Sequence, residues 1–157
     1  MMNHQKTIAI IGARACNDQI TQIAEQMGAL LAKNGYTLIC GGLGGVMEAA
    51  CKGAEANGGT TIGILPGNDP EDANPFVKIA IATGLGISRN LVIIRSAEAV
   101  VAISGGFGTL SEMAFALQLQ KPVVGIGTWD VSDQIEKASD PEDAMRKLAK
   151  VLSKVYG

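Results

Sequence analysis

Short runs of Ile, Val, Leu and Ala alternate along the chain with longer segments in which apolar residues recur every three or four positions. The runs predict strands at residues 7–12, 36–40, 60–65, 77–82, 97–103 and 121–127. The helical spacing predicts helices at residues 18–33, 46–56, 87–95, 110–117 and 141–155, with Asp18 as the expected cap of the first. This alternation predicts an α/β fold, a Rossmann-like open and mostly parallel sheet of roughly five to seven strands with helices on both faces.

The length and composition predict one domain with an aliphatic core. The chain has 157 residues, of which 47% are hydrophobic and 18% are charged, and it contains no linker or low-complexity segment. We therefore expect a single Rossmann-like nucleotide- or phosphate-binding domain over residues 1–157. Aromatic residues make up only 4%, which argues against a platform for stacking single-stranded nucleic acid.

Charge, cysteine and histidine content argue against several partners and cofactors. The net charge is −2 and no long basic run is present, so the chain has no electrostatic footprint for nucleic acid or for an anionic membrane. Three cysteines without a Cys-x-x-Cys pair, and a single histidine, predict no disulfide framework, no metal site and no Ser-His-Asp triad. No apolar run reaches signal-peptide or transmembrane length, so we expect a cytoplasmic protein.

The stretch from Ser104 to Glu112 carries the most specific chemical signal. A buried strand is followed by three glycines within four residues, and helical spacing resumes after Thr109. Such a glycine loop before a helix exposes backbone N–H groups to an anion. We therefore predict that a ligand phosphate binds at Gly105, Gly106, Gly108 and Thr109, with Glu112 at the rim. The alternative is a plain capped turn, because Thr109 and Glu112 also have the spacing of a capping box.

A second glycine loop follows the second predicted strand. Two such loops at strand ends favour a shared ligand crevice, and the candidate residues of this second loop are Gly41, Gly42, Gly44 and Gly45. The alternative is that these glycines serve only close packing between helix and strand.

Two arginines are candidate ligands for an anion. Arg14 stands at the carboxyl end of the first strand, where ligands of open α/β sheets bind, although a solvated role is equally compatible with its position. Arg89 stands in the first turn of a short predicted helix that Ser88 can cap. A cation is unfavourable there unless an anion is nearby, which makes Arg89 the better candidate.

The residues Gly105 to Glu112 resemble the hallmark Pro-Gly-Gly-x-Gly-Thr-x-x-Glu of the LOG ("lonely guy") family, long described as lysine decarboxylase-like. The segment from Gly41 to Ala50 is similar to the upstream glycine motif of that family, and Arg89 falls where the family has an Arg-Lys pair. The resemblance covers residues 7 to 127 in order. No lysine stands at a strand end beside the crevice, so lysine decarboxylation is set aside.

This resemblance implies an enzyme that hydrolyses the N-glycosidic bond of a nucleoside 5′-monophosphate. The residues matching the catalytic pair of the family are Arg89 and Glu112, and the products are a free base and ribose 5-phosphate. The phosphate lies on the loop at residues 105–109, and no cofactor is required. The resemblance also implies a homodimer or homotetramer, and a small phosphorylated molecule as the partner.

Three departures from the LOG pattern are closer to a compact branch similar to molybdenum cofactor carrier proteins and to DNA-processing protein A. Ser104 stands in place of the proline, and Asn90 in place of the lysine. The chain is also short, and its first turn at residues 13–16 does not match the usual small polar turn. This branch implies the second hypothesis, a non-catalytic carrier or sensor that binds molybdopterin or a nucleotide on the same loops. A third hypothesis, an interaction protein whose glycine loops serve packing alone, predicts no saturable binding of a phosphorylated ligand.

Overall fold

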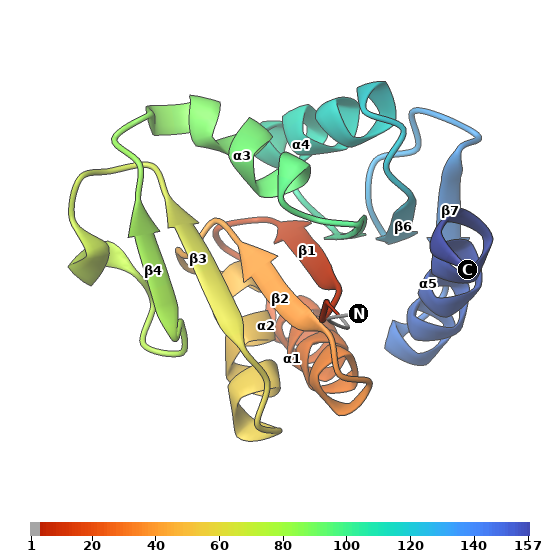
Figure 1. Cartoon of the computed structure of the whole chain (residues 1–157), viewed down its shortest axis with the longest axis horizontal. Helices are drawn as coiled ribbons and strands as arrows, with labels where there is room; N and C mark the ends of the chain where they lie inside the picture. The colour runs from red at the N-terminus through yellow and green to blue at the C-terminus, as the bar shows by residue number, and fades with distance from the viewer. Residues whose placement is uncertain (1–3) are drawn as a thin grey trace.

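The apolar runs form a seven-stranded sheet in the computed structural model, which describes residues 4–157 (Figure 1). Within this region every pair of neighbouring strands is parallel, in the order β4-β3-β2-β1-β5-β6-β7. The strands are β1 (Thr7–Gly12), β2 (Thr37–Cys40), β3 (Thr61–Leu65), β4 (Ile79–Ala82), β5 (Ala99–Ile103), β6 (Val123–Ile126) and β7 (Ile135–Ala138). The predicted Rossmann-like α/β fold is confirmed.

Helices cover both faces of the sheet (Figure 1). The face with α1 (Asp18–Lys33), α2 (Val46–Ala56) and α5 (Pro141–Tyr156) is opposite the face with α3 (Arg89–Arg95) and α4 (Phe107–Gln118). Strand β1 serves both layers, because successive side chains point to opposite faces. Ile8 and Ile10 join the core under α1, α2 and α5, whereas Ala9 and Ile11 join the core under α3 and α4. Burial of each large apolar side chain contributes about 1.5–3 kcal/mol.

Three local predictions were wrong. Asn17, not Asp18, caps α1, because its side chain accepts the N–H of Ile20 at 2.9 Å. Ser88 makes no capping hydrogen bond, because it ends a 3-10 turn (Gly86–Ser88) that runs directly into α3. Strand β7 was not predicted, and only Ile135 among its four residues is fully buried, so its hydrophobic signal is weak.

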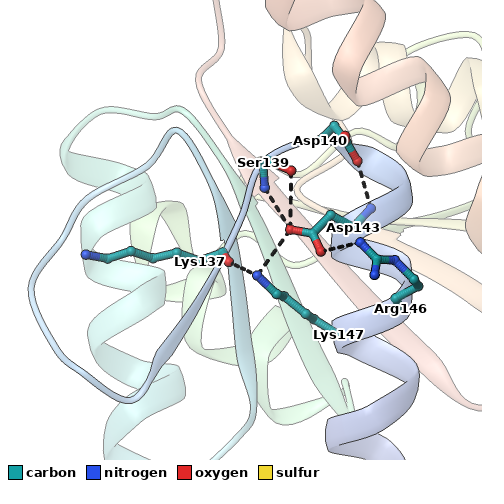
Figure 2. Close-up of polar contacts among 6 residues, drawn as sticks. All are labelled: Lys137, Ser139, Asp140, Asp143, Arg146 and Lys147. Carbon is teal, nitrogen blue, oxygen red and sulfur yellow. Dashed lines mark hydrogen bonds and ion pairs between the residues drawn. The ribbon is translucent and has the colours of Figure 1, made fainter.

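The N-terminus of α5 is closed by side chains of its own sequence (Figure 2). Asp140 accepts the N–H of Asp143 at 2.7 Å, and the Asp143 carboxylate accepts the N–H of Ser139 at 3.0 Å. Arg146 and Lys147 pair with the same carboxylate, and Lys147 also donates to the Lys137 carbonyl of β7. These contacts satisfy the first turn of α5 and attach the helix to the edge of the sheet.

The strand order places a crevice at the carboxyl ends of the central strands. The chain leaves β1 to form β2 on one side and returns later to form β5 on the other. This reversal is a topological switch point, where the loops that follow the flanking strands diverge and leave room for a ligand. Among residues 4–157, no helix is both long enough and apolar enough to cross a membrane.

Candidate functional site

A pocket of about 490 Å³ lies at the carboxyl ends of β1, β2 and β5. It brings together residues that are far apart in the sequence and were predicted as site residues: Arg14, Gly41, Arg89, Gly106, Gly108, Thr109 and Glu112. The size is within the range of cavities that hold a small organic ligand. The remaining predicted residues, Gly42, Gly44, Gly45 and Gly105, lie next to this set in sequence but do not line the cavity.

The N-terminus of α4 opens into this pocket without a side-chain cap. Gly106 occupies the N-cap position, and Thr109 lies inside the first turn with 2% of its surface exposed, so the capping box with Thr109 as the cap was wrong. Within residues 4–157, the backbone N–H groups of residues 105–109 donate to no protein acceptor. We call these five donors the anion cradle. They contrast with the capped first turns of α1 and α5, and they are suited to binding an anion.

Two glycines of this loop are not required by the fold. A Cβ atom added to Gly106 or Gly108 would meet no protein atom within 4 Å. Gly108 lies in a helix, where glycine costs about 0.5–1 kcal/mol relative to alanine. Gly105 is different, because its φ is 114° and an added Cβ would approach the Thr109 side chain to 2.4 Å. Both Gly106 and Gly108 line the pocket.

The second glycine loop is held by packing. Gly42 and Gly45 have φ values of 77° and 68°, and a Cβ on Gly45 would lie 2.2 Å from the carbonyl oxygen of Ala13. That carbonyl already accepts the first helical N–H of α2, from Val46, at 2.9 Å. The N-terminus of α2 is therefore partly closed by protein. A ligand contact at Gly42, Gly44 or Gly45 stays a prediction.

Arg89 is buried in the pocket wall and held by three acceptors. Its Nε atom donates to the Ile64 carbonyl at 2.8 Å, its Nη2 atom to the Gly41 carbonyl at 3.4 Å, and its Nη1 atom to Asn90 Oδ1. Burial lowers the pKa of Arg89, although the nearby Glu112 opposes that shift. A guanidinium keeps its charge even so. Gly41 makes this arrangement possible, because a Cβ there would lie 2.7 Å from Nη2.

Glu112 is the unpartnered acid of the site. It is only 8% exposed and lines the pocket, yet no hydrogen bond or ion pair within residues 4–157 reaches its carboxyl group. Burial raises the pKa of Glu112 to about 8, with Arg89 acting in the opposite direction. At neutral pH the group therefore carries a proton for most of the time. The electrostatic conflict between an acid and a phosphate site is correspondingly small.

Arg14 adds a second positive charge at the mouth of the pocket. Its side chain is exposed and belongs to the lining, and it takes part in no ion pair in the described part of the chain. Its charge is close enough to add to the effect of burial on the pKa of Arg89. Two arginines facing a protonated Glu112 leave the pocket with a positive charge, although the whole chain is slightly acidic.

The apolar wall and one polar residue of the pocket were not predicted from the sequence. The wall consists of Leu43, Met47, Pro66 and Ile87, of which Ile87 is 86% exposed. Asn90 lines the cavity, orients Arg89 and also donates to Ser111 Oγ at 3.3 Å. The sequence signal that could have identified Asn90 is its position directly after Arg89, the candidate arginine. The apolar residues carried none, because they are indistinguishable from core positions in the sequence.

Ser104, which directly precedes the anion cradle, has an unusual backbone conformation. Its φ is 52°, one of two positive values for non-glycine residues in the described region. Proline has a φ fixed near −65°, so this backbone cannot be that of a Pro-Gly-Gly loop. The substitution of serine for the proline of the LOG motif therefore accompanies a different path of the chain.

Two proteins illustrate which sequences this chain is similar to. An uncharacterized protein of Archaeoglobus fulgidus is 41% identical over 138 residues, which cover 88% of this chain and 91% of that protein. The cytokinin riboside 5′-monophosphate phosphoribohydrolase of Mycobacterium marinum is 33% identical over 112 residues. That match covers 68% of this chain but 59% of the enzyme.

Solved structures match the fold over nearly the whole chain. The molybdenum cofactor binding protein of Rippkaea orientalis has a TM-score of 0.90 and 35% identity, with 96% of this chain and 99% of that chain covered. The molybdenum cofactor carrier protein of Chlamydomonas reinhardtii has a TM-score of 0.87 and 32% identity over the same shares. DNA processing protein A of Helicobacter pylori, with a TM-score of 0.71 and 22% identity over 93% of this chain and 81% of that chain, shares the fold alone.

These similarities agree with the resemblance to LOG proteins and to molybdenum cofactor carriers that the glycine motifs indicate. The match to a family model is more extensive than the motifs, since it runs from residue 5 to residue 154. The chain therefore belongs to the SLOG cluster4 family.

Proposed function

We propose that this protein binds a small phosphorylated molecule of the nucleotide or pterin type, with the phosphate on the anion cradle. The observation that carries the proposal has two parts: five N–H groups without an acceptor among residues 4–157, and a helical glycine, Gly108, that no neighbouring atom of those residues requires. A fold that needs only packing has no reason to keep glycine there. An anion that must approach the backbone closely supplies the reason.

The charges and the shape of the pocket support the same ligand class. Arg14 and Arg89 provide the positive charge, while protonation of Glu112 removes the opposing negative charge. The apolar wall around Leu43, Met47 and Ile87 offers surface for a planar ring system at the other end of the ligand. Molybdopterin and a nucleoside monophosphate both carry a phosphate, so the cradle supports either ligand.

Of the two functions considered, we favour binding without turnover, as in a carrier of the molybdenum cofactor. Stabilising an oxocarbenium ion needs an ionised carboxylate, whereas the pKa of Glu112 is raised to about 8. A nearby phosphate anion raises that pKa further. The near-complete overlap with the Rippkaea and Chlamydomonas proteins also supports this choice, since the matches to hydrolases cover 59% and 71% of those enzymes.

N-glycosidic hydrolysis remains the second candidate because of one observation. Arg89 and Glu112 both line the cavity that contains the cradle. A carboxylic acid with a pKa near 8 is suited to donate a proton to a departing base, and in that mechanism the protonated form of Glu112 is an advantage.

The deciding experiment measures binding and turnover in the same samples. We expect molybdopterin or adenosine 5′-monophosphate to raise the melting temperature, and adenosine, which lacks the phosphate, to leave it unchanged. Chromatography of incubated nucleoside monophosphates is expected to show no free base. Base released by the wild type but not by Glu112→Gln would establish the hydrolase instead, and absence of binding by every phosphorylated ligand would reject both functions.

Assembly can be tested alongside binding. We propose a homodimer or homotetramer, because large apolar side chains stay exposed on the described part of the chain, among them Ile79, Ile81 and Ile87. Multi-angle light scattering is expected to give twice or four times the mass of the chain.

A further inference from the structure

Two hydrogen bonds reach the back of the glycine loop from the segment that follows β6. Thr128 Oγ1 donates to the carbonyl of Ser104 at 2.6 Å, and Trp129 Nε1 donates to the carbonyl of Gly106 at 3.1 Å. Neither residue lines the pocket, and both line a separate hollow of about 330 Å³. The two donors therefore contact the loop from outside the ligand cavity.

The geometry of the peptide group relates these two hydrogen bonds to the orientation of N–H groups in the anion cradle. In a trans peptide the C=O and the following N–H point in opposite directions, and residues 4–157 contain no cis peptide bond. A Ser104 carbonyl held by Thr128 therefore directs the N–H of Gly105 away from β6. The Gly106 carbonyl accepts both Trp129 Nε1 and the Leu110 N–H of α4, the latter at 3.0 Å, so Trp129 reinforces an orientation that directs the N–H of Phe107 the opposite way. Both N–H groups lack a protein acceptor within the described residues.

Packing holds the two donors in place. The ring of Trp129 stacks on that of Phe107, with centroids 6.1 Å apart and planes at 24°. Thr128 fits against Gly125, where a Cβ would lie 2.6 Å from its Cγ2 atom. The Ser104 residue whose carbonyl Thr128 binds is the one with a φ of 52°. The strained residue of the loop is thus fixed by a specific hydrogen bond.

We propose that Thr128 and Trp129 are positioning residues that preorganise the anion cradle by orienting the N–H groups of Gly105 and Phe107 toward the ligand phosphate. The inference rests on the proposed function, because it concerns how that phosphate is bound. Gly105 is already a predicted phosphate-binding residue, so the inference adds one donor, the N–H of Phe107, and it assigns a role to the segment that follows β6. Glu112 is buried in the same cavity without a partner among residues 4–157, which independently indicates a ligand site there.

The test is an NMR titration of ¹⁵N-labelled protein with inorganic phosphate. In the wild type we expect the amide signals of Gly105 and Phe107 to shift with the added phosphate. Thr128→Val and Trp129→Phe remove one donor each and keep most of the packing, so each should weaken phosphate binding about three- to tenfold. Thr128→Ser should restore it. Thr83→Val serves as the matched control, because it removes a hydroxyl-to-carbonyl bond of the same 2.6 Å length at the end of β3.

The outcomes separate the inference from the proposed function. If the wild type shows no phosphate-dependent shifts at residues 105–109, the proposed phosphate site is wrong and the inference fails with it. If the wild type binds phosphate but neither Thr128→Val nor Trp129→Phe changes the dissociation constant, only the positioning role is overturned. Equal weakening by Thr83→Val would also overturn it, since the effect would then be a general loss of stability.

Discussion

The two glycine loops look alike in sequence and differ in what surrounds them. In the loop after β2, an added side chain on Gly41, Gly42 or Gly45 would approach another protein atom to less than 3 Å. In the loop after β5, an added side chain on Gly106 or Gly108 would meet nothing within 4 Å. The first helical N–H of α2 is bound by a protein carbonyl, whereas the N–H groups that begin α4 are free among the described residues.

This difference separates glycine that serves the fold from glycine that serves a ligand. Where neighbouring atoms exclude a Cβ, the protein itself explains the glycine. Where the space is open and the residue is helical, glycine lowers the stability of the fold although no packing contact requires it. The explanation must then come from a molecule that occupies the space. The contrast predicts opposite responses to the same Gly→Ala change in the two loops.

The largest effect is expected for Gly45→Ala. The new methyl group would lie 2.2 Å from the Ala13 carbonyl in a residue with a φ of 68°, so clash and backbone strain act together. We expect the free energy of unfolding to fall by about 3 kcal/mol or more, measured by urea denaturation. Gly58→Ala is the matched control, since Gly58 has a φ of 72° but open surroundings, and it should cost about 1–2 kcal/mol. Equal losses at the two positions would contradict the role of packing at Gly45.

The next effect concerns the buried acid beside the cradle. Because the pKa of Glu112 is raised to about 8 from an ordinary 4.5, the folded protein holds a proton that the unfolded chain has lost between those pH values. The free energy of unfolding therefore decreases as the pH rises through this interval, and the full penalty is present above pH 8. Glu112→Gln removes the penalty, so it should stabilise the fold by roughly 2–5 kcal/mol at pH 8.5 and by little at pH 4.5.

Urea denaturation across this pH range measures the effect of Glu112→Gln. Glu55→Gln, on the exposed side of α2, controls for the loss of one carboxylate from the surface. A constant difference between wild type and Glu112→Gln at every pH would show that Glu112 is not buried in its protonated form.

Much of the fold was predictable because hydrophobic runs report directly on buried parallel strands. Strand β5, with five fully buried residues, gave a strong signal, whereas β7 gave a weak one. Site residues with special chemistry, such as Arg89 and Glu112, could be selected because charge at a strand end or helix start is unusual. The burial of these two residues and the direction of their pKa shifts could not be predicted, since both depend on contacts between β3, α3 and α4.

The sequence also could not distinguish the two loops. Whether a glycine faces a carbonyl or a cavity depends on the segment that packs against it, and for Gly45 that segment is the turn after β1. The helix start at Phe107 was missed for a related reason. A phenylalanine between two glycines gives no periodic signal, and the capping box at Thr109 offered a plausible but wrong alternative.

Gly108→Ala should separate stability from binding. Alanine is the better helix former and meets no protein atom, so we expect the free energy of unfolding to rise by about 0.5–1 kcal/mol. The methyl group enters the space assigned to the phosphate, so binding of a phosphorylated ligand should weaken at least tenfold, or about 1.4 kcal/mol. Calorimetry and urea denaturation measure the two quantities. Gly53→Ala, also in a helix, should instead destabilise the fold, because the added Cβ would lie 1.9 Å from the Glu25 carbonyl oxygen. Unchanged ligand affinity in Gly108→Ala would remove the main support for the cradle.

The smallest effect is expected for Ser104→Gly, at the entrance to the same loop. Ser104 and Gln120 both have positive φ values, 52° and 57°, and glycine adopts that conformation without the steric cost. Both substitutions should therefore stabilise the fold by about 0.5–1 kcal/mol. They should differ in binding, because glycine at 104 loosens the carbonyl that Thr128 holds, whereas Gln120 lies at the far end of α4. We expect Ser104→Gly to weaken binding of a phosphorylated ligand by about twofold and Gln120→Gly to leave it unchanged. If the two variants bind equally well, the strain at Ser104 belongs to the turn alone and not to the organisation of the cradle.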